Sequence, residues 1–394
     1  MLVYPFNVFD EEYESLMKKL EVSECGSSIM RDRFALETFV ASDISTPAAN
    51  VVKQQVLALG GEAAVPAHAV NCSKPKSDFV FSLRRDKIPE FISRMKAQCW
   101  KLPQVADFVE KFVGSQKPWF SFSHPGIDTT RPNIMGILNV TPDSFSDGGS
   151  WTNIDAALEH VSEMLENGAD IIDVGGESTR PGSDPVDAET EKKRVVPVIA
   201  EIKKQFPKAV ISIDTVKSSV ADAAINAGAE IVNDVSGLTF DPEIASVCAD
   251  AGKPVVIGHI KGSPKNMQEN PVYENLFSEM LDFFNKSKDQ LLSKGLAESK
   301  IMLDPGIGFG KTLEHNLAIT KHLEVFFSCL DPVVVGFSRK SMIGAVCGRK
   351  NPLERLAGTV ALDTIALEKG AAVIRVHDVK EAKDTLEIFR EVSK

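Results

Sequence analysis

Eight polar or ionisable groups follow eight short apolar runs in the second two-thirds of this 394-residue chain. In chain order they are Asn139, Glu177, Asp214, Asn233, His259, Asp304, residues 338–341 (SRKS), and Arg375 with His377. The carboxylates of Asp214 and Asp304 can accept hydrogen bonds from ring N–H and amino groups. Asn233 and Lys340 can donate to ring carbonyls and nitrogens. Together they predict a pocket for a flat, amide-rich heterocycle.

A second set of side chains suggests anion binding. Arg375 and His377 are two residues apart, so in a strand both point to one face. With Asn139 they provide a cation, an imidazole and an amide for a phosphate or diphosphate. Magnesium prefers few protein ligands and several waters, so Asn139 and phosphate oxygens are expected to share one Mg²⁺.

Two small-residue-rich segments, 140–149 (VTPDSFSDGG) and 175–183 (GGESTRPGS), are expected to form lids over bound substrate. The segment 306–312 (GIGFGKT) resembles a phosphate-cradling P-loop, but that pattern requires glycine where the chain has Pro305. We interpret it as a tight turn in which Gly308 lets the backbone approach a ligand and Phe309 covers its ring.

The apolar runs predict the strands that must position these groups. They are residues 134–138, 171–174, 210–213, 231–232, 255–257, 301–303, 333–335 and 373–376. Amphipathic helical stretches lie between most of them, and Gly168, Gly228 and Gly370 suit the left-handed ends of three of these helices. Eight alternating units predict a (β/α)8 TIM barrel with its active site at the carboxyl ends of the strands. The alternative is a doubly wound open sheet.

The first third of the chain predicts a separate small α/β domain, residues 1–120, of unknown role. Its expected strands are 34–39 and 79–83, and its expected helices are 47–59 and 87–99. Residues 121–133 are interpreted as a linker, and the barrel as residues 134–394. Two domains also suit the length, because single cores rarely exceed roughly 250–300 residues.

Composition limits the partners. The chain has 44 basic and 55 acidic residues, a formal charge of −11, which argues against a nucleic-acid partner recruited by overall charge. The six cysteines form no Cys-x-x-Cys pair and are expected to be reduced thiols of a cytoplasmic protein. No signal peptide or membrane-spanning run is recognised. Small-molecule substrates are therefore expected.

Seven segments between residue 133 and the C-terminus resemble the motifs of the dihydropteroate synthase family. They are 134–149 (IMGILNVTPDSFSDGG), 170–182 (DIIDVGGESTRPG), 211–215 (ISIDT), 233–237 (NDVSG), 303–311 (LDPGIGFGK), 336–344 (GFSRKSMIG) and 374–379 (IRVHDV). The resemblance implies a transferase of folate biosynthesis, the target of sulfonamides. Such an enzyme joins 6-hydroxymethyl-7,8-dihydropterin diphosphate to 4-aminobenzoate and releases pyrophosphate and 7,8-dihydropteroate.

The resemblance also implies roles for individual residues. The pterin site would consist of Asp214, Asn233, Asp304 and Lys340, beside Gly308 and Phe309. The diphosphate site would consist of Asn139, Arg375 and His377, with magnesium at Asn139. The 4-aminobenzoate site would consist of Phe145, Thr179, Arg180, Pro181 and Ser341. Asp147 belongs to the first lid. The electron-rich dihydropterin can delocalise a positive charge, so we expect pyrophosphate to leave before the aniline attacks. The catalytic groups would be Asp214, Asp147, Lys340, Arg375 and His377.

Some features depart from the family or lie outside it. Where the family usually has Met-His-Met after the fifth strand, this chain has Gly258-His259-Ile260, which reshapes one wall of the pterin pocket.

One alternative function is that of a methyltetrahydrofolate:corrinoid methyltransferase, which needs neither Lys340 nor the anion site. Another is a non-catalytic pterin-binding paralogue, in which the lids or anion site would be eroded. Relatives are commonly homodimers, so a homodimer is expected.

Overall fold

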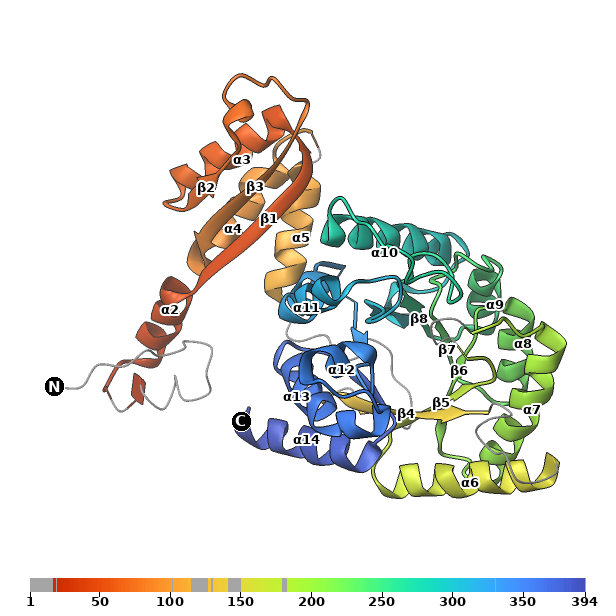
Figure 1. Cartoon of the computed structure of the whole chain (residues 1–394). Coiled ribbons are helices and arrows are strands. Elements are labelled where there is room, and N and C mark those ends of the chain that lie inside the picture. Colours follow the sequence, from red (N-terminus) through yellow and green to blue (C-terminus); the bar gives the residue numbers. More distant parts are fainter. Residues whose placement is uncertain are drawn as a thin grey trace. The chain divides into compact units, whose positions relative to one another are not determined.

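The computed structural model describes residues 17–18, 20–100, 102–114, 127–128, 130–140, 150–178, 183–329 and 331–393. The chain separates into two compact units, divided between Gln116 and Lys117. Figure 1 labels α2 to α5 and β1 to β3 of the first unit, and β4 to β8 and α6 to α14 of the second.

The first unit is a three-stranded antiparallel sheet with helices. Its elements are α2 (Glu24–Phe34), β1 (Leu36–Ser45), α3 (Thr46–Ala58), β2 (Glu62–Ala64), η1 (Ala67–Ala69), β3 (Lys76–Arg84), η2 (Arg85–Lys87), α4 (Ile88–Lys96) and α5 (Leu102–Gly114), with strand order β1-β3-β2. Alternate residues of β3, among them Phe79 and Phe81, are buried against α3, α4 and α5. The predicted strand start at Phe34 is wrong, because Phe34 is the last residue of α2, which Ser23 caps.

The second unit is a barrel of eight parallel strands. They are β4 (Asn133–Asn139), β5 (Ile171–Gly175), β6 (Val210–Asp214), β7 (Ile231–Asp234), β8 (Val255–Gly258), β9 (Ile301–Asp304), β10 (Val334–Val335) and β11 (Val373–Val376). The order is β10-β11-β4-β5-β6-β7-β8-β9, and a parallel bridge between Leu303 and Val333 joins the two ends. The predicted (β/α)8 barrel and all eight of its strands are confirmed, and the open-sheet alternative is wrong.

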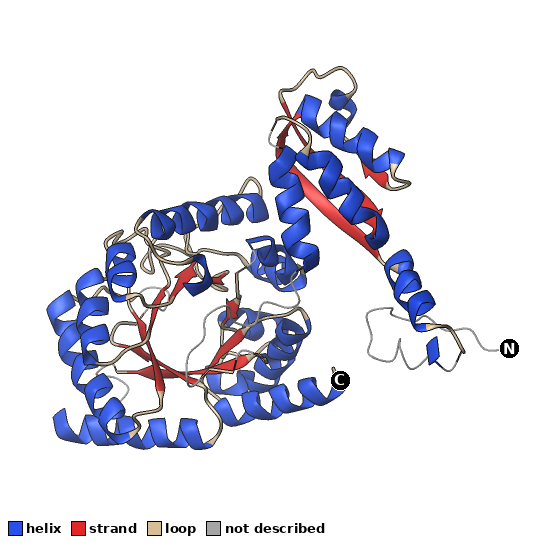
Figure 2. Cartoon of the chain, turned by 180° about the vertical axis from the view of Figure 1, so that it is seen from behind, coloured by secondary structure: helices blue, strands red, loops and turns tan. Residues whose placement is uncertain are grey.

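Helices surround the strands, as Figure 2 shows from behind. They are α6 (Ser150–Glu166), α7 (Ala188–Gln205), α8 (Ser218–Ala227), α9 (Ile244–Ala251), α10 (Leu276–Ser293), α11 (Leu313–Lys321), α12 (Ser341–Cys347), α13 (Leu356–Glu368) and α14 (Val379–Val392), with short 3₁₀ segments η4 (Glu298–Lys300), η5 (Leu323–Cys329) and η6 (Pro352–Arg355). The joint glycines Gly168, Gly228 and Gly370 have φ of 96°, 117° and 95°. These are the predicted left-handed positions, which glycine adopts without a Cβ clash.

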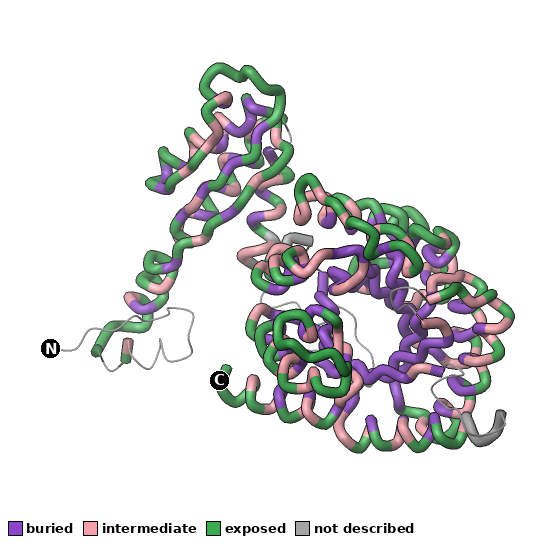
Figure 3. The backbone as a smooth tube through the Cα atoms, in the orientation of Figure 1, coloured by how far each residue is buried: buried purple, intermediate pink, exposed green. Residues whose placement is uncertain are grey.

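The inside of the barrel is apolar at one end and polar at the other. One apolar cluster takes one residue from every strand: Met135, Ile171, Val210, Ile231, Val256, Met302, Val334 and Val373. Side chains two residues apart on a strand share a face, so the next inward layer includes Asp173, Asn233, Asp304 and Arg375. Figure 3 shows the strands as the buried centre of the unit. A charged layer thus lies directly above a closed apolar floor.

None of the helices in the described part of the chain combines the length and apolar character needed to cross a membrane.

Candidate active site

The strand register brings the candidate residues to one rim. Asn139 pairs with Gly175, Gly175 with Asp214, and Asp214 with Asn233, so these positions run along neighbouring strands β4 to β7 at one level. Asp304 ends β9, on the other side of β8. Because parallel strands end at the same edge, the predicted rim of polar groups is present.

A single guanidinium joins two carboxylates in this layer. Arg375 Nη2 donates to Asp214 Oδ2 at 2.7 Å, and Arg375 Nε donates to Asp173 Oδ2 at 2.6 Å. Asn233 Nδ2 also donates to Asp173 Oδ2, at 3.1 Å. The predicted pterin residues Asp214 and Asn233 and the predicted diphosphate residue Arg375 therefore belong to one hydrogen-bonded group.

Burial controls the ionisation of this group. Asp214 is 8% exposed, and burial raises its pKa to about 7; the Arg375 charge opposes the rise and the Asp173 charge adds to it. The pKa of Arg375 is raised, against its own burial, by Asp173 and Asp214. Arg375 thus stays cationic, while Asp214 can hold or release a proton near neutral pH.

Lys340 and the loop after β9 form a second part of the rim. Lys340 Nζ donates to the Ile307 carbonyl and lies 5.0 Å from the centre of the Phe309 ring. Burial lowers the pKa of Lys340 to about 8, opposed by the Asp304 charge. Asp304 Oδ1 accepts from Gly306 N at 2.7 Å, which fixes the turn. The arrangement leaves a compact cation beside an aromatic face.

Gly308 has open space around it. Its φ is +84°, and a Cβ there would have only Lys340 Cδ, at 3.6 Å, near it among the described residues. The left-handed backbone rather than crowding therefore favours glycine. This agrees with the predicted tight turn.

Asn139 is the last residue of β4, and His377 directly follows the neighbouring strand β11. His377 Nδ1 lies 3.0 Å from Ser338 Oγ, and Ser338 Oγ also accepts from His377 N at 3.2 Å. Asn139 is half-buried, and its side chain makes no hydrogen bond within the described ranges. Those ranges contain no group of three or more His, Cys, Asp or Glu side chains able to hold a metal. One free amide oxygen fits a Mg²⁺ held mainly by phosphate oxygens and waters.

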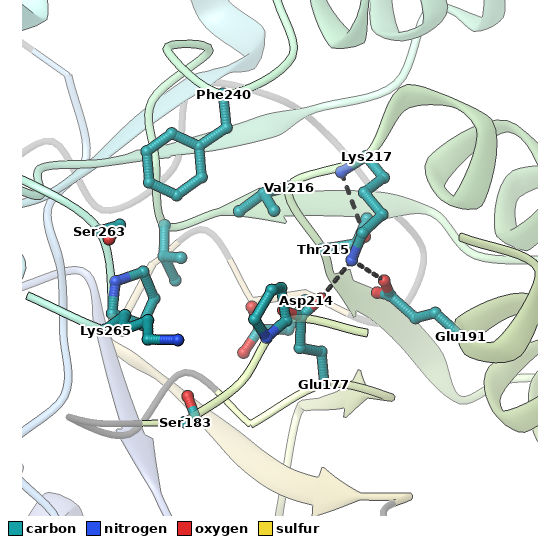
Figure 4. A pocket seen from close by; sticks show the side chains of 13 residues that line it. Glu177, Ser183, Glu191, Asp214, Thr215, Val216, Lys217, Phe240, Ser263 and Lys265 are labelled. Carbon is teal, nitrogen blue, oxygen red and sulfur yellow. Dashed lines mark hydrogen bonds and ion pairs between the residues drawn. The ribbon is translucent and has the colours of Figure 1, made fainter. Parts of the chain in front are cut away.

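Beside Asp214 the rim opens into a cavity of about 250 Å³, drawn in Figure 4. Its wall includes Asp214, Val216, Lys217, Val235, Phe240, Ser263 and Lys265. Lys217 Nζ points toward two carboxylates, pairing with Glu177 and, at 2.5 Å, with Glu191 Oε2. Burial raises the pKa of Glu191, which is 1% exposed, although Lys217 opposes the rise. Glu177 lies within the second predicted lid, residues 175–183.

Five predicted site residues lie outside the described residues: Phe145, Asp147, Thr179, Arg180 and Pro181. The flanks of the second lid are described, and Ser183 Oγ donates to the Ser178 carbonyl at 2.5 Å. Ser341, the remaining residue of the predicted 4-aminobenzoate set, is exposed at the start of α12.

Three charged residues of the rim and its cavity were not predicted from the sequence. Asp173 lies inside a strand rather than at its end, two residues after Ile171 in an otherwise apolar run. A charged residue at that spacing was the signal, because i and i+2 face the same way. Lys217 and Glu191 carried no comparable signal, since lysine and glutamate are ordinary on exposed helix faces and loops.

The end of β8, where the sequence departs from the family, lies close to the backbone that follows β7. A Cβ on Gly258 would lie 2.6 Å from the Cα of Val235, so no larger side chain fits with this backbone. Ile260, where the family usually has its second methionine, is 6% exposed. The close approach of the Val235 backbone therefore leaves no room for a side chain at position 258.

Comparison with known proteins gives consistent matches. The family model described as pterin binding enzyme matches residues 135–377. The chain is 44% identical over 262 residues to the dihydropteroate synthase of Escherichia coli K12, covering 66% of this chain and 92% of that protein. It is 34% identical over 379 residues, 96% of each chain, to the bifunctional dihydropteroate synthase/dihydropteroate reductase of Helicobacter pylori. The solved dihydropteroate synthase of Xanthomonas albilineans with 4-aminobenzoic acid is 40% identical with a TM-score of 0.63, covering 66% of this chain and 93% of that one.

Proposed function

The chain belongs to the pterin-binding enzyme family and is a dihydropteroate synthase, and we propose how its own residues divide the work of that reaction. The observation that carries the proposal is the Arg375 guanidinium between Asp214 and Asp173. This arrangement places a permanent cation, which can bind the leaving diphosphate, next to carboxylates that can bind the heterocycle. A corrinoid methyltransferase releases no anionic leaving group, so its reaction would not need the Arg375 guanidinium as an anion-binding group.

Asp214, Asn233 and Asp304 bind the pyrimidine edge of 6-hydroxymethyl-7,8-dihydropterin diphosphate. Their support is chemical: two carboxyl groups and an amide match the amino, N–H and carbonyl groups of a pterin. Lys340 donates to a ring acceptor, as it now donates to Ile307. Phe309, with Gly308 beside it, covers one face of the ring.

Arg375, His377 and Asn139 receive the diphosphate. A guanidinium forms paired, charge-assisted hydrogen bonds with phosphate oxygens, and His377 and Asn139 add donors. The free amide oxygen of Asn139 is the proposed protein ligand of Mg²⁺, which when bound neutralises charge on the diphosphate.

The substitution proceeds by departure before attack. The bond between the pterin methylene carbon and the diphosphate oxygen breaks, and both electrons leave with pyrophosphate. Arg375 stabilises the leaving charge, while Asp214 and Asp147 stabilise the cation on the methylene. The amino nitrogen of 4-aminobenzoate then bonds to that carbon and releases one proton to solvent. Fixed charges of this kind are typically worth roughly 10²–10³ in rate for one well-placed donor.

The 4-aminobenzoate is proposed to bind over Ser341 and the lid residues Phe145, Thr179, Arg180 and Pro181. The hydroxyl of Ser341 and the backbone at the start of α12 are donors for the carboxylate. The sole support from the described part is the exposed Ser341 beside Lys340.

The wild-type chain tests the proposal directly. With Mg²⁺ it should release one pyrophosphate for each 7,8-dihydropteroate formed, and release should depend on 4-aminobenzoate. Methyl transfer to a corrinoid, or pterin binding with no turnover, would instead establish one of the two alternatives.

A second activity is favoured by the match to the Helicobacter pylori protein, which extends over 96% of this chain. We propose that this chain also reduces dihydropteroate. A hydride from a reduced nicotinamide or flavin would add to C6 of the C6=N5 double bond, and a solvent proton to N5, giving tetrahydropteroate. The full chain mixed with 7,8-dihydropteroate and the donor should oxidise one donor per product; an unchanged donor refutes the second activity.

Two coarser properties are also proposals. We expect a homodimer formed through barrel helices, which sedimentation of the purified chain tests. We also expect a cytoplasmic location, which agrees with the five cysteines described as free thiols, Cys25, Cys72, Cys99, Cys248 and Cys347.

A further inference from the structure

Lys311 is a buried lysine that the proposed reaction does not use. Its side chain is 2% exposed, and its Nζ donates to three backbone carbonyls. The acceptors are the carbonyl oxygens of His259 at 3.1 Å, Gly306 at 3.0 Å and Phe309 at 3.0 Å. Nζ also lies 2.9 Å from His259 Nδ1. One side chain thus joins the end of β8 to two points of the loop after β9.

The two segments that Lys311 joins already lie against each other. A Cβ on Gly306 would lie 2.0 Å from the His259 carbonyl oxygen, and a Cβ on Gly310 would lie 2.3 Å from the Lys261 carbonyl oxygen. The Gly306 carbonyl also accepts from Phe309 N at 3.0 Å, whereas Lys311 is the donor to the carbonyls of His259 and Phe309. A buried carbonyl without a donor is costly, so Lys311 stabilises the close approach of the two segments.

The loop that Lys311 holds carries groups of the pterin site. Its Ile307 carbonyl accepts from Lys340, and its Phe309 ring lies under the Lys340 ammonium. A shift of this loop would therefore move Phe309 and Lys340 together. Other side chains also bind the loop: Tyr273 donates to the Gly310 carbonyl at 2.8 Å, and Asn316 Oδ1 accepts from Gly308 N at 2.7 Å.

The charges around Lys311 are few. Burial lowers its pKa well below the ordinary value, the Asp304 charge opposes this and the Lys340 charge adds to it. Burial, together with Lys311 and Lys261, lowers the pKa of His259 to about 2, so the imidazole is neutral. Three carbonyls and His259 Nδ1 surround Nζ. An ammonium has three N–H groups to share among these four acceptors, whereas a neutral amine has two, so the acceptors favour the charged form.

We propose that Lys311 is a positioning residue for the pterin ring, because its buried Nζ ties β8 to the loop after β9 and so fixes Phe309 and the carbonyl that holds Lys340. The inference rests on the pterin site proposed above. Lys311 is not expected to touch the substrate, and 4-aminobenzoate, expected over α12 and the lids, is outside its influence.

The test compares Lys311→Met with Lys321→Met, an exposed lysine of the neighbouring helix α11. Calorimetry with 6-hydroxymethyl-7,8-dihydropterin, which lacks the diphosphate, measures binding of the ring alone. Lys311→Met should weaken it about tenfold or more, as misplaced binding groups do. The KM for 4-aminobenzoate should stay within about twofold, as should every constant of the surface variant.

An unchanged affinity of Lys311→Met for the dihydropterin, or an equal rise in both KM values, overturns the inference. A wild-type chain that releases no pyrophosphate would instead overturn the proposed function. If Lys311→Met does not fold, His259→Leu and His259→Asn take its place. His259→Leu removes the Nδ1 atom that accepts from Lys311 Nζ, whereas His259→Asn keeps an acceptor near that position. Only His259→Leu should therefore weaken binding of the dihydropterin. Equal affinities of the two variants also overturn the inference.

Discussion

Replacing Asp173 by asparagine removes the one charge that binds both halves of the site. Asp173 is fully buried, and its Oδ2 accepts from Arg375 Nε and Asn233 Nδ2. The amide has nearly the same shape, and its oxygen can take the place of Oδ2, so both donors keep an acceptor but lose its negative charge. Its NH₂ group takes the place of Oδ1, which is buried and accepts no hydrogen bond within the described residues.

The magnitude follows from these contacts. A hydrogen bond to a charged group contributes about 1.5–3 kcal/mol and a neutral one about 0.5–1.5 kcal/mol, so weakening both bonds should lower the free energy of unfolding by about 2–3 kcal/mol. If the same loss appears in the transition state, about 2.7 kcal/mol corresponds to a hundredfold fall in kcat/KM for the pterin diphosphate. The KM for 4-aminobenzoate should change little.

The assay is pyrophosphate release at varied pterin diphosphate, with urea unfolding of the same samples. Asp170→Asn is the matched control. Asp170 binds Arg131 at 2.6 Å and lies just before β5, at the opposite end of the strand from the rim. That variant should lose comparable stability and keep its kcat/KM.

Equal losses of kcat/KM in Asp173→Asn and Asp170→Asn would show that destabilisation alone explains the effect. Full activity in Asp173→Asn would show that Asp173 does not orient Arg375 or Asn233. Either result refutes the reasoning from the shared carboxylate.

Three further predictions concern Arg375, Asp214 and Lys340. Arg375→Ala should lower the rate of pyrophosphate release on the order of 10²-fold or more, and a loss below tenfold would contradict its role at the leaving group. The pKa of Asp214 is raised to about 7 from 3.8, so between these pH values the folded chain binds more protons than the unfolded chain and stability falls as pH rises. Unfolding of Asp214→Asn against pH should lack this slope; a wild-type slope in the variant excludes Asp214 as its source. The pKa of Lys340 is lowered to about 8, so kcat/KM should fall above that pH as the ammonium is lost. Lys340→Arg should move the fall to higher pH, and an unmoved profile assigns it to another group.

The barrel could be predicted because its signals are local and repeated. The apolar run of each strand and the left-handed Gly168, Gly228 and Gly370 each depend on only a few neighbouring residues. The rim followed from topology, since parallel strands end at one edge. In the first unit Phe34 was assigned to the wrong element, because an apolar residue at a helix end and one at a strand start look alike.

The partners within the site could not be predicted in the same way. Asp173 and Arg375 are 202 residues apart in the chain, and their contact depends on how β5 and β11 face each other across β4. Lys311 looked like part of a phosphate loop, and only the packing of its loop against β8 shows its acceptors. Contacts of this kind are set by the closed barrel rather than by local sequence.

Binding of 6-hydroxymethyl-7,8-dihydropterin without its diphosphate tests the central claim most directly, which is that a pterin slot and an anion site share one cavity with separate residues. Calorimetry should give clearly weaker binding for Asp214→Asn and nearly unchanged binding for Arg375→Ala, although the second variant has lost its turnover. Equal losses of affinity in both variants, or an unchanged affinity in Asp214→Asn, would contradict the division of the site.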